Sequence, residues 1–264
     1  MKLKRARRIV QALTIVLLVA VPLLNKKGIT IVSGTLYSLA IGPIWITDPL
    51  IGMQTILTML TMDMALLLSM LIPIVLTLAL GRVFCGWACP QNTISEFVDF
   101  AADRFGLKRP FGKNTTAVPR YAVLVAILVI TPLAGIPLAS LLSAPGIISV
   151  QVSKFIYEGI VGLELGLIGV IVIGELFLVR RVWCNYLCPI GSFSGIFRLS
   201  RTLKVVFTED AEHVCGKCLA CAEACRLGLN PMEGGIYPQC HNCGACISAC
   251  DGIKAEKRPL VFKF

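Results

Sequence analysis

Eight cysteines stand close together near the end of the chain, in two runs of identical spacing. Residues 215–225 read CGKCLACAEAC and residues 240–250 read CHNCGACISAC, which in both cases is C-x2-C-x2-C-x3-C. This spacing is typical of bacterial ferredoxins, because three thiolates on one tight loop can reach three irons of a [4Fe–4S] cluster. The fourth iron takes a thiolate from elsewhere in the chain. The two runs therefore predict two [4Fe–4S] clusters.

In two-cluster ferredoxins the fourth cysteine of each run serves the other cluster. The predicted ligands are Cys215, Cys218, Cys221 and Cys250 for one cluster, and Cys240, Cys243, Cys246 and Cys225 for the other. This crossed ligation links the two runs and stabilises a tail that is too small to be held together by an apolar core alone. Structural zinc is disfavoured, because it normally uses two cysteine pairs separated by a longer spacer. The proline that usually follows the fourth cysteine is replaced by Arg226 and Asp251, which bears on loop shape and not on ligation.

A different cysteine motif also occurs twice. Residues 82–90 read RVFCGWACP and residues 181–189 read RVWCNYLCP, and five of the nine positions are identical, including both cysteines and the proline. Disulfides are disfavoured in a reducing compartment, and catalysis by a single thiol pair would favour C-x2-C spacing. A structural role at a helix end, with the proline ending or restarting the helix, remains open.

A shared site is the other interpretation of this pair. Two thiols at positions i and i+4 lie on one face if the segment is helical, and two such faces would supply four soft ligands for a metal or cluster. The four residues are Cys85, Cys89, Cys184 and Cys188. They are candidates for a third metal site, or for a surface on which the ferredoxin tail docks.

Composition indicates that membrane helices must position these cysteines. The 264-residue chain is 56% hydrophobic and only 15% charged, with a mean hydropathy of +0.80, as in membrane proteins. Four apolar runs predict four spans, at residues 9–24, 64–80, 121–136 and 159–179. The first run resembles a signal peptide but has no small-residue cleavage site, so it is expected to remain as a span.

Lysine and arginine are distributed so as to orient these spans. The N-terminus, the 82–120 loop and the stretch after the fourth span are basic, whereas the two other loops hold only Lys26, Lys27 and Lys154. The positive-inside rule places both termini on the cytoplasmic side of a bacterial inner membrane. Both copies of the nine-residue motif then lie at one face, as in a parallel repeat. This topology accounts for the net charge of +10, so no nucleic-acid partner is expected.

The predicted fold class is mainly α. A four-helix transmembrane bundle is expected over residues 1–204, in contact with the lipid bilayer, and a small α+β domain like a bacterial ferredoxin over residues 205–264. These boundaries follow the drop in hydropathy after Arg201.

The remaining ionisable residues are weaker candidates. Glu164 lies toward the outer side of the fourth predicted span, where intramembrane acids are often functional, and is a candidate proton acceptor for a quinol. Its alternative role is pairing with a neighbouring helix. Asp48 and Asp63 are expected to be solvated, and His213 and His241 to lie at the surface.

The combination of motifs resembles a known family. CGWACP, CNYLCP and the two ferredoxin runs are similar to those of the NapH-like ferredoxin-type membrane proteins, and GTLYSLAIGPIWITDPL is similar to their first outer loop. The resemblance covers nearly the full chain. It implies oxidation of quinol from the quinone pool, with electrons passed to a partner iron–sulfur protein or multihaem cytochrome and on to a respiratory reductase. Related assembly and regulatory proteins share the motifs, so an assembly or metal-handling factor, or a redox-sensing scaffold, is the alternative.

Overall fold

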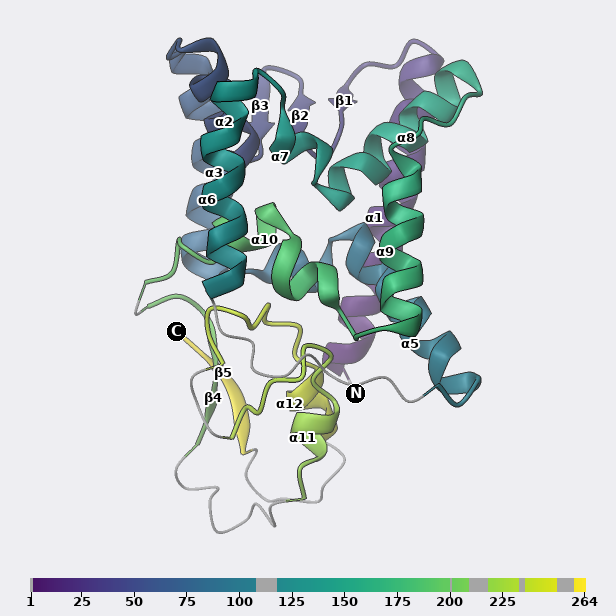
Figure 1. The fold of residues 1–264 in the computed structure, drawn as a ribbon, viewed down its shortest axis with the longest axis vertical. Helices are drawn as coiled ribbons and strands as arrows, with labels where there is room; N and C mark the ends of the chain where they lie inside the picture. Colours follow the sequence, from purple (N-terminus) through teal and green to yellow (C-terminus); the bar gives the residue numbers. More distant parts are fainter. Residues whose placement is uncertain (1, 108–117, 200, 209–217, 233–235, 251–258) are drawn as a thin grey trace.

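The computed structural model describes residues 2–107, 118–199, 201–208, 218–232, 236–250 and 259–264 (Figure 1). These residues are mainly helical, as predicted. The helices before the tail are α1 (Lys2–Lys26), α2 (Pro49–Met59), α3 (Met64–Leu80), α4 (Val83–Trp87), α5 (Pro90–Arg104), α6 (Val118–Ala134), α7 (Leu138–Leu141), α8 (Ala144–Glu158), α9 (Leu165–Phe177), the π-helix η1 (Trp183–Leu187) and α10 (Pro189–Ser194). Between α1 and α2, strands β1 (Val32–Gly34), β2 (Ser38–Ile41) and β3 (Ile44–Thr47) form an antiparallel sheet.

A helix occupies each of the four predicted spans, but the helices differ in length. Among the described residues, α1 alone is long and apolar enough to cross a membrane by itself. Helices α3 and α6 have 17 residues each, and α9 has 13. At ~1.5 Å per residue, α9 is roughly 20 Å long, short of a ~30 Å hydrocarbon core. The four-span bundle therefore stays a prediction.

The short fourth helix has a local cause. Gly159 ends α8 in the left-handed conformation, with φ of 71°. The first residue of the predicted fourth span is therefore the C-cap of the preceding helix. Glycine is the residue that adopts this conformation without strain. Large apolar side chains are nevertheless exposed on all four helices, such as Val16, Leu68, Val125 and Val170. An exposed apolar belt of this kind is expected where lipid covers the protein.

The chain passes through one series of elements twice. Helices α1, α2, α3, α4 and α5 correspond in order to α6, α8, α9, η1 and α10. Helix α1 packs against α8 while α6 packs against α2, so the first helix of each half lies on the intermediate helix of the other. This interlocking agrees with a parallel repeat and brings both cysteine motifs to the side of the molecule that faces the tail (Figure 1).

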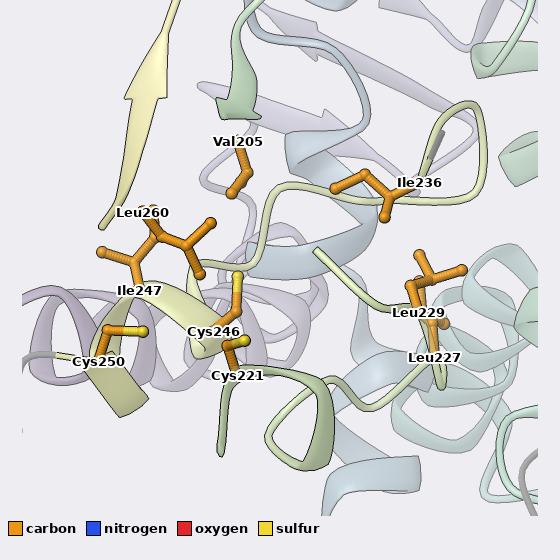
Figure 2. Packing of buried hydrophobic residues seen from close by; sticks show 9 residues of the cluster. All are labelled: Val205, Cys221, Leu227, Leu229, Ile236, Cys246, Ile247, Cys250 and Leu260. Atoms are coloured by element: carbon orange, nitrogen blue, oxygen red, sulfur yellow. The ribbon is translucent and has the colours of Figure 1, made fainter. Parts of the chain in front are cut away.

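The tail is a small α+β unit with its own core. Strands β4 (Lys204–Phe207) and β5 (Leu260–Lys263) pair in antiparallel fashion, beside α11 (Ala220–Glu223) and α12 (Ala245–Cys250). Figure 2 shows its buried residues, which mix aliphatic side chains with cysteines. Leu3 of α1 and Cys184 of η1 pack against this core from outside the tail. The start of α1 therefore lies beside the tail, while the 204/205 boundary stays a prediction.

Candidate functional site

Four cysteines of the tail are neighbours, one of them buried and three partly buried. They are Cys225, Cys240, Cys243 and Cys246. Burial raises the pKa of the Cys246 thiol, and the charges of the other three raise it further. Burial also raises the pKa of Cys240 to about 11. These are the four residues that the crossed arrangement assigns to one cluster, and that ligation remains a prediction.

The other predicted set is only partly described. Cys221 and Cys250 are buried in the same tail core, on the helices α11 and α12 that pack together. Figure 2 shows both, with Cys246, in one interior. Cys218 is exposed, and Cys215 lies outside the described residues. Within the described part of the chain, no three His, Cys, Asp or Glu side chains converge on one metal ion. The thiolates of a [4Fe–4S] cluster each bind a separate iron and need no such convergence.

The two C-x3-C-P motifs come together although they are far apart in the sequence. Cys89 interacts electrostatically with Cys85, Cys184 and Cys188, and Cys184 and Cys188 each interact with Cys85. Burial raises the pKa of Cys184 to about 12 and of Cys188 to about 11, and it raises that of Cys89 strongly. The four thiols therefore form one group, with Cys89 buried and the other three partly buried, which we call the thiol site.

The local geometry of each motif differs from one continuous helix. Cys85 lies in α4, whereas Cys89 is the N-cap of the next helix, α5, and Cys188 is likewise the N-cap of α10 after η1. The expectation that both thiols share a helix face is wrong, because the residue before a proline is driven to extended backbone. Cys89 and Cys188 accordingly have ψ of 120° and 110°.

Each N-cap cysteine meets a backbone N–H three residues later. The Gly191 N–H donates to Cys188 Sγ at 3.5 Å. At Cys89 the equivalent group, the Asn92 N–H, lowers the thiol pKa that burial raises. The first N–H groups of a helix have no partner within it, so they favour a thiolate at the cap. The prolines thus have a structural role, since each one places the preceding cysteine at a helix N-cap, where its sulfur meets a backbone N–H.

The arginine that begins each motif contacts the segment that follows the other copy of the motif. Arg181 Nη1 donates to Asn92 Oδ1 at 2.7 Å, and Arg181 Nη2 lies 3.0 Å from Asp99 Oδ2. In the mirrored contact, a Cβ built on Gly191 would lie 2.6 Å from Arg82 Nη2. Asn92 and Gly191 each stand three residues after the second cysteine of their copy. Both arginines are buried, so they have a structural role in addition to being among the basic residues that predict the orientation of the spans.

Several buried side-chain nitrogens beside the thiol site have no hydrogen-bond partner among the described residues. They are Arg82 Nε, Arg120 Nε and Nη1, Trp183 Nε1 and His241 Nε2. Arg120 also donates through Nη2 to the Cys184 carbonyl at 2.6 Å. A buried N–H without an acceptor costs about 1–3 kcal/mol. A thiolate-bound iron–sulfur cluster offers sulfur acceptors and tunes its potential through such bonds. The donor set therefore fits an anionic cluster.

The tail docks directly on the first motif. Trp87 Nε1 donates to the Asn242 carbonyl at 3.0 Å, and Arg82 Nη1 donates to the carbonyls of Pro238 and Gln239, both at 2.9 Å. Between them lies His241, which is buried and whose pKa falls well below its usual value through burial and through the charge of Arg82. The expectation of a surface histidine is wrong here, and His213 lies outside the described residues.

A chain of ion pairs adds to this docking. Arg226 Nη1 lies 3.3 Å from Glu96 Oε2 on α5, and Arg7 Nη2 lies 2.9 Å from Glu96 Oε1. Arg226 is the residue that takes the place of the usual ferredoxin proline. The sequence departure at this position thus supplies a contact between the tail, α5 and α1.

Glu164 and Asp48, two of the three acids singled out from the sequence, have different surroundings. Glu164 precedes α9, where Gln151 Nε2 donates to its Oε2 at 2.7 Å and Lys154 lies 3.6 Å from its Oε1. This is the pairing that the sequence left as the alternative, and a proton-accepting role for Glu164 stays a prediction. Asp48 is partly buried at the start of α2, so the expectation of a solvated residue is wrong.

Comparison with known proteins gives a family match, no matching solved structure and several relatives. A family described as a 4Fe-4S binding domain matches residues 62–108 and 161–205. Each matched segment contains one C-x3-C-P motif, and neither contains the ferredoxin runs at 215–225 and 240–250. No solved structure matches the chain.

Three relatives match most of the chain. It is 27% identical to the ferredoxin-type protein NapH of Haemophilus influenzae, over 86% of this chain and 77% of the relative. It is 25% identical to NapH of Escherichia coli, over 81% and 75%. It is 30% identical to the methylamine utilization ferredoxin-type protein MauN of Methylorubrum extorquens, over 83% and 73%.

Proposed function

Since the chain belongs to the family of ferredoxin-type proteins that includes NapH and MauN, we propose that this iron–sulfur electron-transfer protein links the quinone pool to the redox partners of a respiratory reductase. In this proposal it sits in the bacterial inner membrane through four spans, with both termini in the cytoplasm. The position of the start of α1 beside the tail supports that topology, because both then lie at one membrane face.

The observation that carries the proposal is the contiguity of the two cysteine-rich regions. Cys184 of the thiol site packs against the tail core, and Gly86, between Cys85 and Cys89, lies against the loop that carries His241 and Cys243. Electron transfer through protein requires redox centres that are close together. A thiol site that touches a ferredoxin-like tail meets this requirement without any further element.

We assign three clusters to these cysteines. The tail holds two [4Fe–4S] clusters with crossed ligands, as the spacing predicts. The thiol site holds the third, for which the mutual interaction of four cysteines, the unpaired buried donors and the matched 4Fe-4S family are the support. When bound, such a cluster would supply one-electron chemistry. Arg82, Arg120 and Arg181, whose charges act on Cys184 or Cys188, would balance its negative charge.

The exposed side of the tail is the place where electrons leave for a partner. Cys218 is exposed, so the cluster that it helps to hold lies near the surface and within reach of a partner iron–sulfur protein or multihaem cytochrome. The thiol site, by contrast, is buried next to the membrane helices. The order of centres is therefore quinone, thiol site, tail and partner.

Anaerobic purification with iron quantitation and electron paramagnetic resonance (EPR) tests this function. Three clusters correspond to about 12 iron atoms per chain. Duroquinol, a soluble hydroquinone, should reduce at least part of the iron–sulfur absorbance, and duroquinone should reoxidise the reduced protein. Full iron content with clusters that exchange no electrons with either compound would refute the proposed function.

A further inference from the structure

A large apolar cavity lies among the helices, outside the cysteine sites. Its volume is about 630 Å³, within the usual ~300–1,000 Å³ of small-molecule sites. It is enclosed by α1, α3, α8, α10 and the β1–β3 sheet, and aliphatic and aromatic side chains such as Leu18, Leu76 and Phe193 dominate its lining. The helices around it expose apolar side chains on their outer faces, so a lipid-soluble ligand is the kind that would reach it.

The two ends of the cavity differ chemically. At one end the lining includes Phe84, which precedes Cys85, and Ile190, which lies two residues after Cys188. A ligand there is adjacent to the thiol site. At the other end the lining includes the sheet, Asp48 and Ser149. The lining of the cavity therefore includes both neighbours of the thiol site and the carboxyl group of Asp48.

Asp48 is the one ionisable residue among the described residues that line the cavity. Its Oδ1 accepts from the backbone N–H groups of Leu50 at 2.9 Å and Ile51 at 3.3 Å, which caps α2. No described residue donates to Oδ2, so that oxygen is free to receive a proton. Burial raises the Asp48 pKa to about 6, which makes the carboxylate a better base than an ordinary aspartate.

Each of the six side-chain hydroxyls in the lining has a hydrogen-bond partner in the protein. The hydroxyls of Thr14, Thr77, Ser153 and Ser194 donate to backbone carbonyls within their own helices. Thr35 Oγ1 accepts from the Tyr37 N–H. Ser149 Oγ donates to the Gly146 carbonyl and accepts from the Leu36 N–H. A ligand in the cavity thus meets one carboxylate, with an oxygen that accepts no hydrogen bond from the described residues, in a mostly apolar lining, which suits a planar ring with a hydroxyl at its edge.

We propose that this cavity binds the ring of a hydroquinone and that Asp48 Oδ2 accepts one of its two hydroxyl protons. The inference rests on the proposed function, because the electron acceptor is the cluster assigned to the thiol site. Oxidation breaks two O–H bonds and releases two protons and two electrons. One proton passes to Asp48 and the other to water. The two electrons would leave one at a time through the cluster assigned to the thiol site, which would pass the first to a tail cluster before it takes the second. The product is the quinone.

The Asp48→Asn variant separates the proton-accepting role from the helix cap. Asparagine caps a helix about as well as aspartate but takes no proton at Oδ1 or Nδ2. The full chain in lipid nanodiscs is mixed with duroquinol, and bleaching of the iron–sulfur absorbance is followed. Loss of a general base typically slows a reaction by 10²–10⁴, so we expect a rate at least about 100-fold lower in D48N. Dithionite should still reduce the variant fully.

Asp63→Asn is the matched control. Asp63 is the N-cap residue of α3, is exposed and does not line the cavity, so D63N should reduce at the wild-type rate. A wild-type rate in D48N, or a slow rate in Glu164→Gln together with a normal rate in D48N, would overturn the assignment of Asp48. In both cases the wild-type protein still reacts with duroquinol, so the proposed function survives.

A second pair of variants tests the cavity itself. Leu18→Trp fills the cavity from α1, whereas Val16→Trp places the same ring on the exposed face of that helix. We expect L18W to raise the half-saturating duroquinol concentration at least about tenfold and V16W to leave it unchanged. Equal half-saturating concentrations for L18W, V16W and the wild type would overturn the cavity as the site. So would a phospholipid that occupies the cavity and that duroquinol does not displace. Iron-loaded wild-type protein that never reacts with duroquinol would instead defeat the proposed function.

Discussion

Gly86 lies in direct contact with His241. A Cβ built on Gly86 would come within 2.5 Å of the His241 carbonyl oxygen and 2.7 Å of its Cδ2 atom. Gly86 stands between the two cysteines of the first nine-residue motif, and His241 stands between the first two cysteines of the second ferredoxin run. The absence of a side chain at position 86 is therefore what allows the thiol site and the tail to meet.

Gly86→Ala should loosen this junction. The added methyl group must displace backbone and a buried ring, and overpacking of this kind typically costs about 1–3 kcal/mol. Limited proteolysis of the protein in nanodiscs should release the tail faster from G86A than from the wild type. Gly174→Ala is the control, because nothing lies within 4 Å of a Cβ at Gly174. Equal tail release from the two variants would contradict a tight junction.

Replacing Cys85 and Cys184 together by serine should remove the cluster of the thiol site alone. Two of four ligands are lost, so we expect the iron content to fall by about a third, from about 12 to about 8 atoms per chain. The EPR signals of the two tail clusters should remain after dithionite reduction. An unchanged iron content in C85S/C184S would show that the thiol site is a docking element only.

Crossed ligation in the tail can be distinguished from ligation within each run. Cys218→Ser and Cys225→Ser lie in the same run, yet the crossed arrangement places them on different clusters. Each single variant should therefore weaken one EPR signal, and the two signals should differ. The double variant C218S/C225S should weaken both. If the double variant affects one cluster only, the ligands are not crossed.

Arg181→Met should destabilise the junction between the two halves of the repeat. Arg181 is 1% exposed and bonds Asn92 and Asp99, so its loss leaves buried acceptors unpaired, at a cost of about 3 kcal/mol or more. The thermal midpoint, measured by tryptophan fluorescence, should fall clearly. Its neighbour Arg180 is 22% exposed at the side chain, and Arg180→Met should cost at most about 1 kcal/mol. Similar losses in R180M and R181M would contradict a special role for Arg181.

Local patterns of the sequence account for much of the structure. The apolar run at 64–80 coincides with α3 (Met64–Leu80), because an uninterrupted apolar segment needs no distant partner to be helical. The grouping of Cys225 with Cys240, Cys243 and Cys246 also follows from spacing, because cluster ligands are set by short loops. The predicted start of the fourth helix, at residue 159, is wrong. Gly159 ends the preceding helix through its left-handed backbone conformation, which hydropathy does not predict.

The sequence by itself determined the chemistry of this protein: its twelve cysteines, their spacings and the repeat define which ligands exist and predict which ones belong together. Only the tertiary structure decided what surrounds them. It buried His241 against Gly86, brought Arg82, Arg120 and Arg181 close enough for their charges to act on the thiols, and placed Asp48 in an apolar cavity instead of water. The physical reason is that burial and the charge neighbours of a residue depend on packing between segments far apart in the chain, and no local pattern encodes them.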